Sequence, residues 1–117
     1  MLVIRHAKIF TAADKTYERG DIAVENGKII AVAEKLPVPD YAEIIEADGL
    51  FAMPGIVDAH SHVGGFGAGD SQDLNEMTCN ATPAVESFYA IDSDSKDFPR
   101  IIRAGITTSV IAPGSGN

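Results

Sequence analysis

The amino-acid sequence predicts an α/β protein with a β-rich portion over residues 1–53 and a strand–helix–strand unit over residues 54–117. Two observations lead to this prediction. Residues 21–33 have the pattern of a β-hairpin, because two β-rich runs flank an Asn-Gly dipeptide. After Pro54 the order of local patterns becomes strand, long loop, helix and strand, which is the order of a βαβ unit with parallel strands.

The hairpin is the strongest local signal in the β-rich portion. Asn26 and Gly27 suit the two positive-φ positions of a type I′ turn, whose twist matches that of the flanking strands. In this register Glu25 lies opposite Lys28, and an apolar pair follows, so both cross-strand pairs favour the hairpin. We expect a hairpin centred on this turn.

The rest of this portion predicts a small antiparallel β structure. Short strands are expected at residues 2–4, 8–10 and 44–47, with residues 17–20 as a connection. His6 falls in the first strand and is expected to be an ordinary strand residue.

The second portion predicts a strand over residues 56–62, a helix over residues 97–104 and a strand over residues 106–112. Within the helix, apolar residues recur at i, i+3 and i+4. Gly105 follows at the position where a left-handed residue commonly ends a helix. The loop of about 30 residues between the first strand and the helix is longer than a plain connection needs, and such loops are usually either functional or disordered.

The candidate chemistry lies at the end of the first of these strands, in Asp58, His60 and His62. Alternate residues of a strand share a face, so two imidazoles spaced in this way can reach one divalent cation. Asp58 would orient a metal-binding histidine by accepting a hydrogen bond from it, or would instead cap neighbouring backbone N–H groups. A bare His-x-His also occurs by chance, and two unliganded histidines are the plain alternative. Histidines at the carboxyl end of a parallel strand, however, lie where α/β barrels place their active sites.

The run Pro-Gly-Ile-Val-Asp-Ala-His-Ser-His at residues 54–62 is similar to the metal-binding motif of the amidohydrolase superfamily. Residues 27–29 and 47–49 look like the amino-terminal segment of that family, and residues 104–108 resemble the entry into its second barrel strand. Residues 75–78 look like the branch related to imidazolonepropionase. The resemblance covers essentially the whole chain.

The resemblance implies a small β-sandwich whose amino-terminal strands lie in residues 1–53, and a TIM-like barrel that begins in residues 54–117. It implies that His60 and His62 bind one or two divalent metal ions, with zinc expected. The further ligands and the catalytic Asp would come from later strands. The sequence holds roughly two of the eight barrel strands, so we expect an incomplete barrel, no catalytic residue within this chain and no activity from the chain alone.

The predicted function is therefore metal-dependent hydrolysis of a C–N bond in an amide, a cyclic amide or a dipeptide, with this chain as an amino-terminal segment of the enzyme. The alternative is a non-catalytic, truncated β-rich module that self-associates or binds a partner. The expected partners are a small-molecule amide substrate and either a complementary carboxy-terminal chain or a second copy. Asp73, Glu76 and Ser115 are candidates for contact with substrate, although a solvated acidic loop and a plain turn also account for them.

Composition excludes several other classes of function. The net charge is −8 and no Lys/Arg cluster is present, which argues against a nucleic-acid partner. No run approaches the roughly 20 apolar residues of a membrane span. The single cysteine, Cys79, cannot form an internal disulfide. A cytoplasmic protein is expected.

Overall fold

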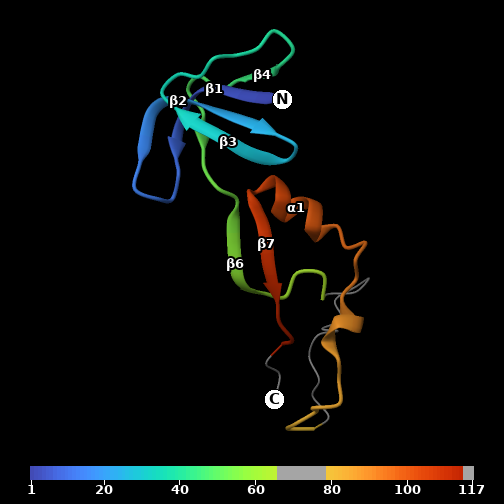
Figure 1. Ribbon diagram of the computed structural model, residues 1–117. Helices are drawn as coiled ribbons and strands as arrows, with labels where there is room; N and C mark the ends of the chain where they lie inside the picture. Colours follow the sequence, from blue (N-terminus) through green and yellow to red (C-terminus); the bar gives the residue numbers. More distant parts are fainter. Residues whose placement is uncertain (66–78, 115–117) are drawn as a thin grey trace. The chain divides into compact units, whose positions relative to one another are not determined.

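The structure is a computed structural model that describes residues 1–65 and 79–114 (Figure 1). The chain divides into two compact units, Met1–Pro54 and Gly55–Asn117. The described residues are mostly in strands, with a single α-helix and one short 3₁₀ turn among them. None of the helices in these ranges has the length and apolar character needed to cross a membrane.

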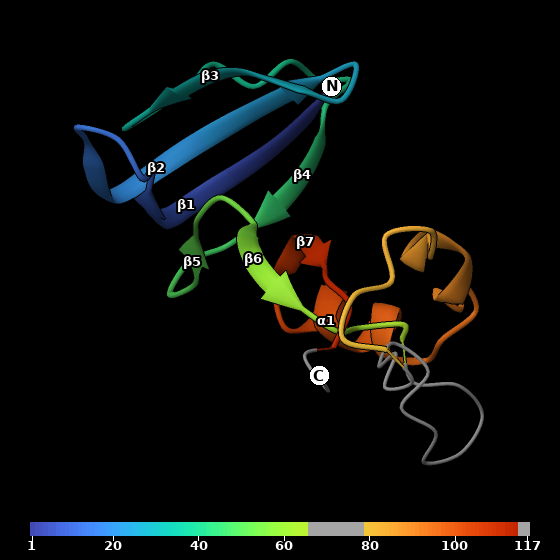
Figure 2. The ribbon, with the colours of Figure 1, turned by 90° about the horizontal axis from the view of Figure 1, so that it is seen from below.

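The first unit is a five-stranded mixed sheet (Figure 2). It consists of β1 (Leu2–Phe10), β2 (Thr16–Glu25), β3 (Lys28–Ala33), β4 (Glu43–Glu46) and β5 (Phe51–Ala52). The order is β3-β2-β1-β4, and β5 also pairs with β1. A second sheet, which a sandwich requires, is not found among the described residues of this unit.

The prediction that this portion is antiparallel is wrong for two strands. β1, β2 and β3 form an antiparallel meander, but β4 and β5 both run parallel to β1. The chain leaves β3 and returns beside the start of β1, where Glu43 donates its backbone N–H to the Met1 carbonyl at 3.1 Å. A parallel strand needs such a crossover, and the pairing depends on residues about 40 positions apart, which local patterns do not report.

The Asn-Gly hairpin is confirmed. Glu25 pairs with Lys28 and Val24 with Ile29. Asn26 and Gly27 have φ angles of 50° and 73°, as a type I′ turn requires.

The predicted connection at residues 17–20 is instead part of β2. Gly20 has the composition of a turn residue, but it serves close packing within the sheet. A methyl group at this position would lie 2.8 Å from Ile9 Cδ1 and 2.9 Å from the Ala33 carbonyl oxygen. The glycine therefore allows the side chain of Ile9, a buried core residue, to cross over β2.

The two short strands predicted at residues 2–4 and 8–10 are one strand, β1, interrupted by an irregularity at His6. The pairing of β1 with β2 shifts between Ile4 and Ala7, and His6 has a positive φ of 62°. A non-glycine residue in this region is uncommon and needs support from its surroundings. His6 lies in the first strand, as predicted, but its positive φ makes it an irregular residue of that strand and not the ordinary one that was expected.

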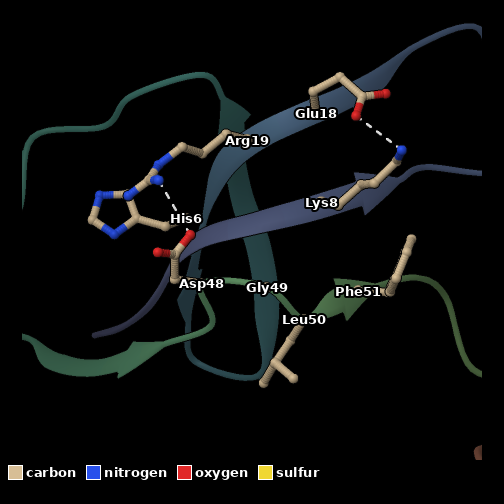
Figure 3. A pocket seen from close by; sticks show the side chains of 8 residues that line it. All are labelled: His6, Lys8, Glu18, Arg19, Asp48, Gly49, Leu50 and Phe51. Carbon is tan, nitrogen blue, oxygen red and sulfur yellow. Dashed lines mark ion pairs between the residues drawn. The ribbon is translucent and has the colours of Figure 1, made fainter.

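A hollow of about 300 Å³ opens on the surface of this unit (Figure 3). Its charged side chains pair with each other: Lys8 Nζ lies 2.8 Å from Glu18 Oε2, and Arg19 Nη1 lies 3.1 Å from Asp48 Oδ1. The remaining lining residues are His6, Gly49, Leu50 and Phe51. These ion pairs link neighbouring parts of the sheet.

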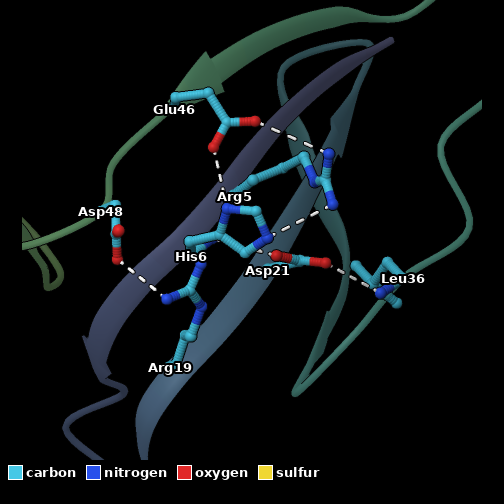
Figure 4. A network of polar contacts seen from close by, with 7 residues as sticks. All are labelled: Arg5, His6, Arg19, Asp21, Leu36, Glu46 and Asp48. Atoms are coloured by element: carbon cyan, nitrogen blue, oxygen red, sulfur yellow. Dashed lines mark hydrogen bonds and ion pairs between the residues drawn. The ribbon is translucent and has the colours of Figure 1, made fainter.

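Asp21 provides the support for the irregularity at His6 (Figure 4). Its carboxylate is 1% exposed. Oδ1 accepts the backbone N–H of His6 at 3.1 Å, and Oδ2 accepts that of Leu36 at 2.9 Å. Burial raises the pKa of Asp21, but these two hydrogen bonds and the charge of Arg5, together with that of His6 when its ring is protonated, outweigh burial and hold the pKa below its ordinary value of 3.8.

The His6 side chain and its neighbours hold β4 against β1. Nδ1 donates to Glu46 Oε2 at 2.8 Å, so Nε2 of the neutral ring accepts from Arg5 Nη2 at 3.3 Å. Arg5 Nη1 also lies 3.6 Å from Glu46 Oε1. His6 therefore contacts Asp21 through its backbone N–H and β4 through its ring.

The second unit contains β6 (Ile56–Ser61), the 3₁₀ turn η1 (Ser87–Ala90), α1 (Asp97–Arg103) and β7 (Ile106–Ile111). β6 and β7 lie side by side and parallel, with α1 between them in sequence (Figure 1). The strand–helix–strand unit is therefore confirmed. Gly105 has a φ of 90° just after the helix, as predicted.

Replacing Asp21 by Asn should lower the free energy of unfolding by about 1.5–3 kcal/mol at pH 7, because an ionised acceptor of two buried N–H groups is lost. Urea denaturation followed by circular dichroism measures this change. Asp48→Asn is the matched control, since its pair with Arg19 is exposed and such pairs contribute about 0–1 kcal/mol.

The effect should also depend on pH. The folded-state pKa of Asp21 is lowered, so its stabilisation is fully present above 3.8 and disappears as the pH falls through the folded-state value. The difference in unfolding free energy between the parent chain and Asp21→Asn should therefore shrink on acidification. A difference that stays constant down to the lowest pH would contradict this role.

Candidate functional site

The start of β6 lies in close contact with β7. The backbone N–H of Ile56 donates to the Gly105 carbonyl at 2.9 Å. A methyl group on Gly55 would lie 2.1 Å from Thr107 Oγ1 and 2.7 Å from Thr107 Cβ. Only glycine fits there without displacing β7, which gives a physical reason for the Pro-Gly pair before the strand.

Further along, β6 contains a β-bulge between Asp58 and Ser61. Asp58 pairs with Ser109 and Ser61 pairs with Ile111, so three steps along β6 match two steps along β7. Because of the bulge, side chains from Asp58 onward do not strictly alternate between the two faces of β6. Alternation alone therefore does not place Asp58, His60 and His62 on one face, as had been assumed from the sequence. Bulges redirect side chains and are frequent beside active sites.

Asp58 acts on the backbone of the bulge. Its Oδ1 accepts the backbone N–H of His60 at 3.1 Å. This contact matches the second of the two roles foreseen for Asp58, the capping of neighbouring backbone. Because the bonded group is the amide of His60, Asp58 restrains the main chain that carries this imidazole.

The two imidazoles lie together at the end of β6. Their ring centroids are 5.3 Å apart and their planes are almost perpendicular, at 89°. His60 is exposed, and His62 is half-buried. A zinc ion about 2 Å from one nitrogen of each of two rings, in tetrahedral geometry, places the ring centres about 5 Å apart. The spacing of the pair therefore fits two ligands of one ion.

The orientation of His62 is determined by β7. Its Nδ1 lies 2.8 Å from the backbone carbonyl oxygen of Ala112. A carbonyl only accepts, so Nδ1 carries the proton and Nε2 of the neutral ring has its lone pair free. Histidines that bind metals commonly make such a contact through their other nitrogen. The arrangement therefore fits metal binding through Nε2.

The turn after His62 adds further restraint. Gly65 donates its backbone N–H to the His62 carbonyl at 3.0 Å, and Gly64 has a φ of 78°. A methyl group on Gly64 would lie 2.7 Å from the ring of Phe98. The turn after β6 is therefore closely packed against Phe98 of α1.

The pair is not a complete metal site by itself. In residues 1–65 and 79–114, no group of three or more His, Cys, Asp or Glu side chains is placed to hold an ion. A tetrahedral zinc ion takes four ligands, so the two histidines provide half of its coordination. Asp73, Glu76 and Ser115 lie outside the described residues.

Three features of the strand pair near His60 and His62 were not identified from the sequence. These are the bulge in β6, the carbonyl of Ala112 and a hydroxyl contact between Ser61 and Ser109. The two serines left a weak signal, since each is a polar residue in an otherwise β-rich run.

No family model matches the chain. It is 38% identical over 104 residues to the amidohydrolase tasK of Hapsidospora irregularis, a match that covers 84% of this chain and 11% of that protein. It is 46% identical over 61 residues to the dihydroorotase of Elusimicrobium minutum, covering 52% of this chain and 14% of the relative.

Among solved structures, the chain is similar to an amidohydrolase from Thermotoga maritima, with 36% identity and a TM-score of 0.86. The match covers 100% of this chain and 31% of that one. The chain thus spans between about a tenth and a third of the length of these proteins. These relatives are members of one superfamily, and the matches to them show that the chain belongs to the amidohydrolase superfamily.

Proposed function

We propose that this chain is the amino-terminal segment of a metal-dependent hydrolase of C–N bonds, to which it contributes the first metal-binding strand. The proposal depends on one observation, the pair His60 and His62, whose rings lie 5.3 Å apart with His62 oriented by the Ala112 carbonyl. The printed names of the relatives, amidohydrolase and dihydroorotase, support hydrolysis of an amide or cyclic amide.

His60 and His62 would hold a divalent cation, with zinc expected because imidazole nitrogen suits it. When bound, such an ion supplies a Lewis acid for the scissile carbonyl and lowers the pKa of a water molecule. The residues of this chain have simpler tasks. The Ala112 carbonyl keeps the proton of His62 on Nδ1, and the Asp58 carboxylate holds the amide of His60. The remaining ligands and the catalytic Asp belong to parts of the enzyme outside this chain.

The parallel pair β6 and β7 with its intervening helix is the unit that a TIM-like barrel repeats, and His60 and His62 lie at the carboxyl end of β6. We therefore propose that residues 54–117 begin such a barrel and that residues 1–53 contribute strands to a small β-sandwich. The incomplete barrel is then completed by further polypeptide.

The finer properties of the enzyme remain predictions. They comprise the imidazolonepropionase-like branch, a dipeptide as possible substrate, substrate contacts by Asp73, Glu76 and Ser115, one or two bound ions and a cytoplasmic location. The proposal also implies a small-molecule amide substrate. No nucleic-acid or membrane partner is expected, because the net charge is −8 and no apolar run approaches the length of a membrane span.

A chimera tests the proposed function. This chain replaces the matching segment of the Thermotoga maritima amidohydrolase, and hydrolysis of cyclic and acyclic amides is measured with added Zn²⁺. The chimera should hydrolyse a substrate of the parent enzyme, whereas His60→Asn or His62→Asn should lower kcat/KM at least about a hundredfold, because loss of a ligand exceeds the effect of losing its supporting contact.

His6→Asn is the matched control, because it removes the third imidazole of the chain from a position in β1. Its chimera should keep both its activity and its zinc content. A folded chimera whose activity survives the loss of His60 and His62 would contradict the proposed role of the pair.

Exposed apolar side chains support the proposal that further polypeptide covers this chain. In the second unit Val57 is 65% exposed and Ile102 is 63% exposed, and in the first unit Phe51 is 74% exposed. Such exposure is typical of surfaces that meet another chain. We propose a complementary carboxy-terminal chain as the partner. The same exposure supports the alternative function, a non-catalytic β-rich module that self-associates.

Light scattering on the separate chain tests whether these surfaces are covered. The chain should associate at micromolar concentration, because strands with exposed apolar faces are unstable alone. Retention of zinc by the associated chain would favour the enzyme segment over the non-catalytic module. A compact monomer at every concentration would contradict the need for a partner.

A further inference from the structure

We propose that the hydroxyl bridge between Ser61 and Ser109 is a positioning device for the two imidazoles at the end of β6. The proposal rests on the proposed metal-binding function and assigns a role to two residues that are not metal ligands themselves. Ser61 lies between His60 and His62 in the chain, and both serines are half-buried.

The hydrogen bonds of the bridge form a chain with a defined direction. The two Oγ atoms are 2.7 Å apart, and Ser61 Oγ donates to the Val110 carbonyl at 3.3 Å. Since the Ser61 proton is used in that contact, the Ser109 hydroxyl donates to Ser61. One hydroxyl on β6 is therefore tied to two consecutive residues of β7.

The bridge spans the bulge. Asp58 pairs with Ser109 before it, and Ser61 pairs with Ile111 after it. Ser61 thus reaches back with its side chain to the β7 residue that precedes the irregularity. Its own carbonyl accepts the backbone N–H of Ala112 at 2.9 Å. Side chain and main chain of Ser61 therefore hold β7 on both sides of Val110, which has no partner in the register.

This arrangement matters most for His60, which lies within the bulge. Its backbone N–H is bound by Asp58 and not by β7, so the neighbouring Ser61 is the first β6 residue after Asp58 that is paired with the other strand. Without the bridge, the pairing of Ser61 with Ile111 remains but the bulge can change its curvature. Metal ligands need placement within about 0.5 Å and 10–20°, so a small change there separates the two rings.

The test is a titration of the chain with Zn²⁺ alone, followed by two-dimensional NMR of the histidine ring nitrogens. In the parent chain Zn²⁺ should shift Nε2 of His62, while Nδ1 remains protonated. Ser61→Ala and Ser109→Ala should each weaken Zn²⁺ binding about tenfold, the lower end of the effect of removing a supporting contact. The double variant should lose little more than either single variant, because both remove the same bridge.

Two variants control for a purely structural effect. Ser109→Thr keeps the hydroxyl and should restore most of the affinity. Ser95→Ala removes a hydroxyl that accepts the backbone N–H of Asp97 near the start of α1, and it should leave zinc binding unchanged. If Ser61→Ala does not fold, Ser109→Ala removes the donor without a change in β6.

The outcomes separate the two proposals. Zinc affinity that is unchanged in Ser61→Ala and Ser109→Ala but lost in His60→Asn and His62→Asn overturns the role of the bridge alone. A chimera with the Thermotoga maritima amidohydrolase that binds Zn²⁺ no better than its His60→Asn and His62→Asn forms overturns the metal-binding function, and the role of the bridge with it.

Discussion

The position of the two imidazoles depends on the parallel pairing of β6 with β7. The contact that orients His62 comes from the Ala112 carbonyl at the end of β7, and the bulge that carries His60 is defined by its register against β7. The space for this pairing begins at Gly55, where a side chain would overlap Thr107. The strand pair is therefore the scaffold of the candidate site, and the histidines cannot be understood apart from it.

The first unit also contains a strand irregularity that is held by an Asp carboxylate. There a strand irregularity at His6 is held by the buried carboxylate of Asp21, which accepts two backbone N–H groups. In β6 the irregularity near His60 is held by the carboxylate of Asp58, which accepts one. In both places an Asp side chain supplies the acceptor that the regular ladder no longer provides. At His6 this acceptor is needed most, because an unpaired amide is costly where water is excluded. The difference is burial, since Asp21 is almost fully enclosed.

Local patterns predicted those elements whose cause is local. The Asn26 and Gly27 turn and the helix that ends before Gly105 follow from residues within one or two elements. The parallel pair of β6 and β7 joins residues that are distant in sequence, and it was predicted from the order strand, helix, strand. The parallel course of β4, the role of Gly20 in close packing and the bulge in β6 escaped prediction. Each depends on a partner strand distant in sequence. For the candidate site, the two histidines and the backbone-capping role of Asp58 were recognisable from the sequence, but the contact of His62 with the Ala112 carbonyl and the contact between the two serine hydroxyls were not.

The central claim is that His60 and His62 converge on one cation. X-ray absorption at the zinc edge of the zinc-loaded chain tests it most directly, because imidazole ligands give a characteristic scattering pattern. Two imidazole nitrogens are expected at about 2.0–2.1 Å from the zinc ion, and a single one after His60→Asn. A spectrum without imidazole scattering, or one that His60→Asn and His62→Asn leave unchanged, would contradict it.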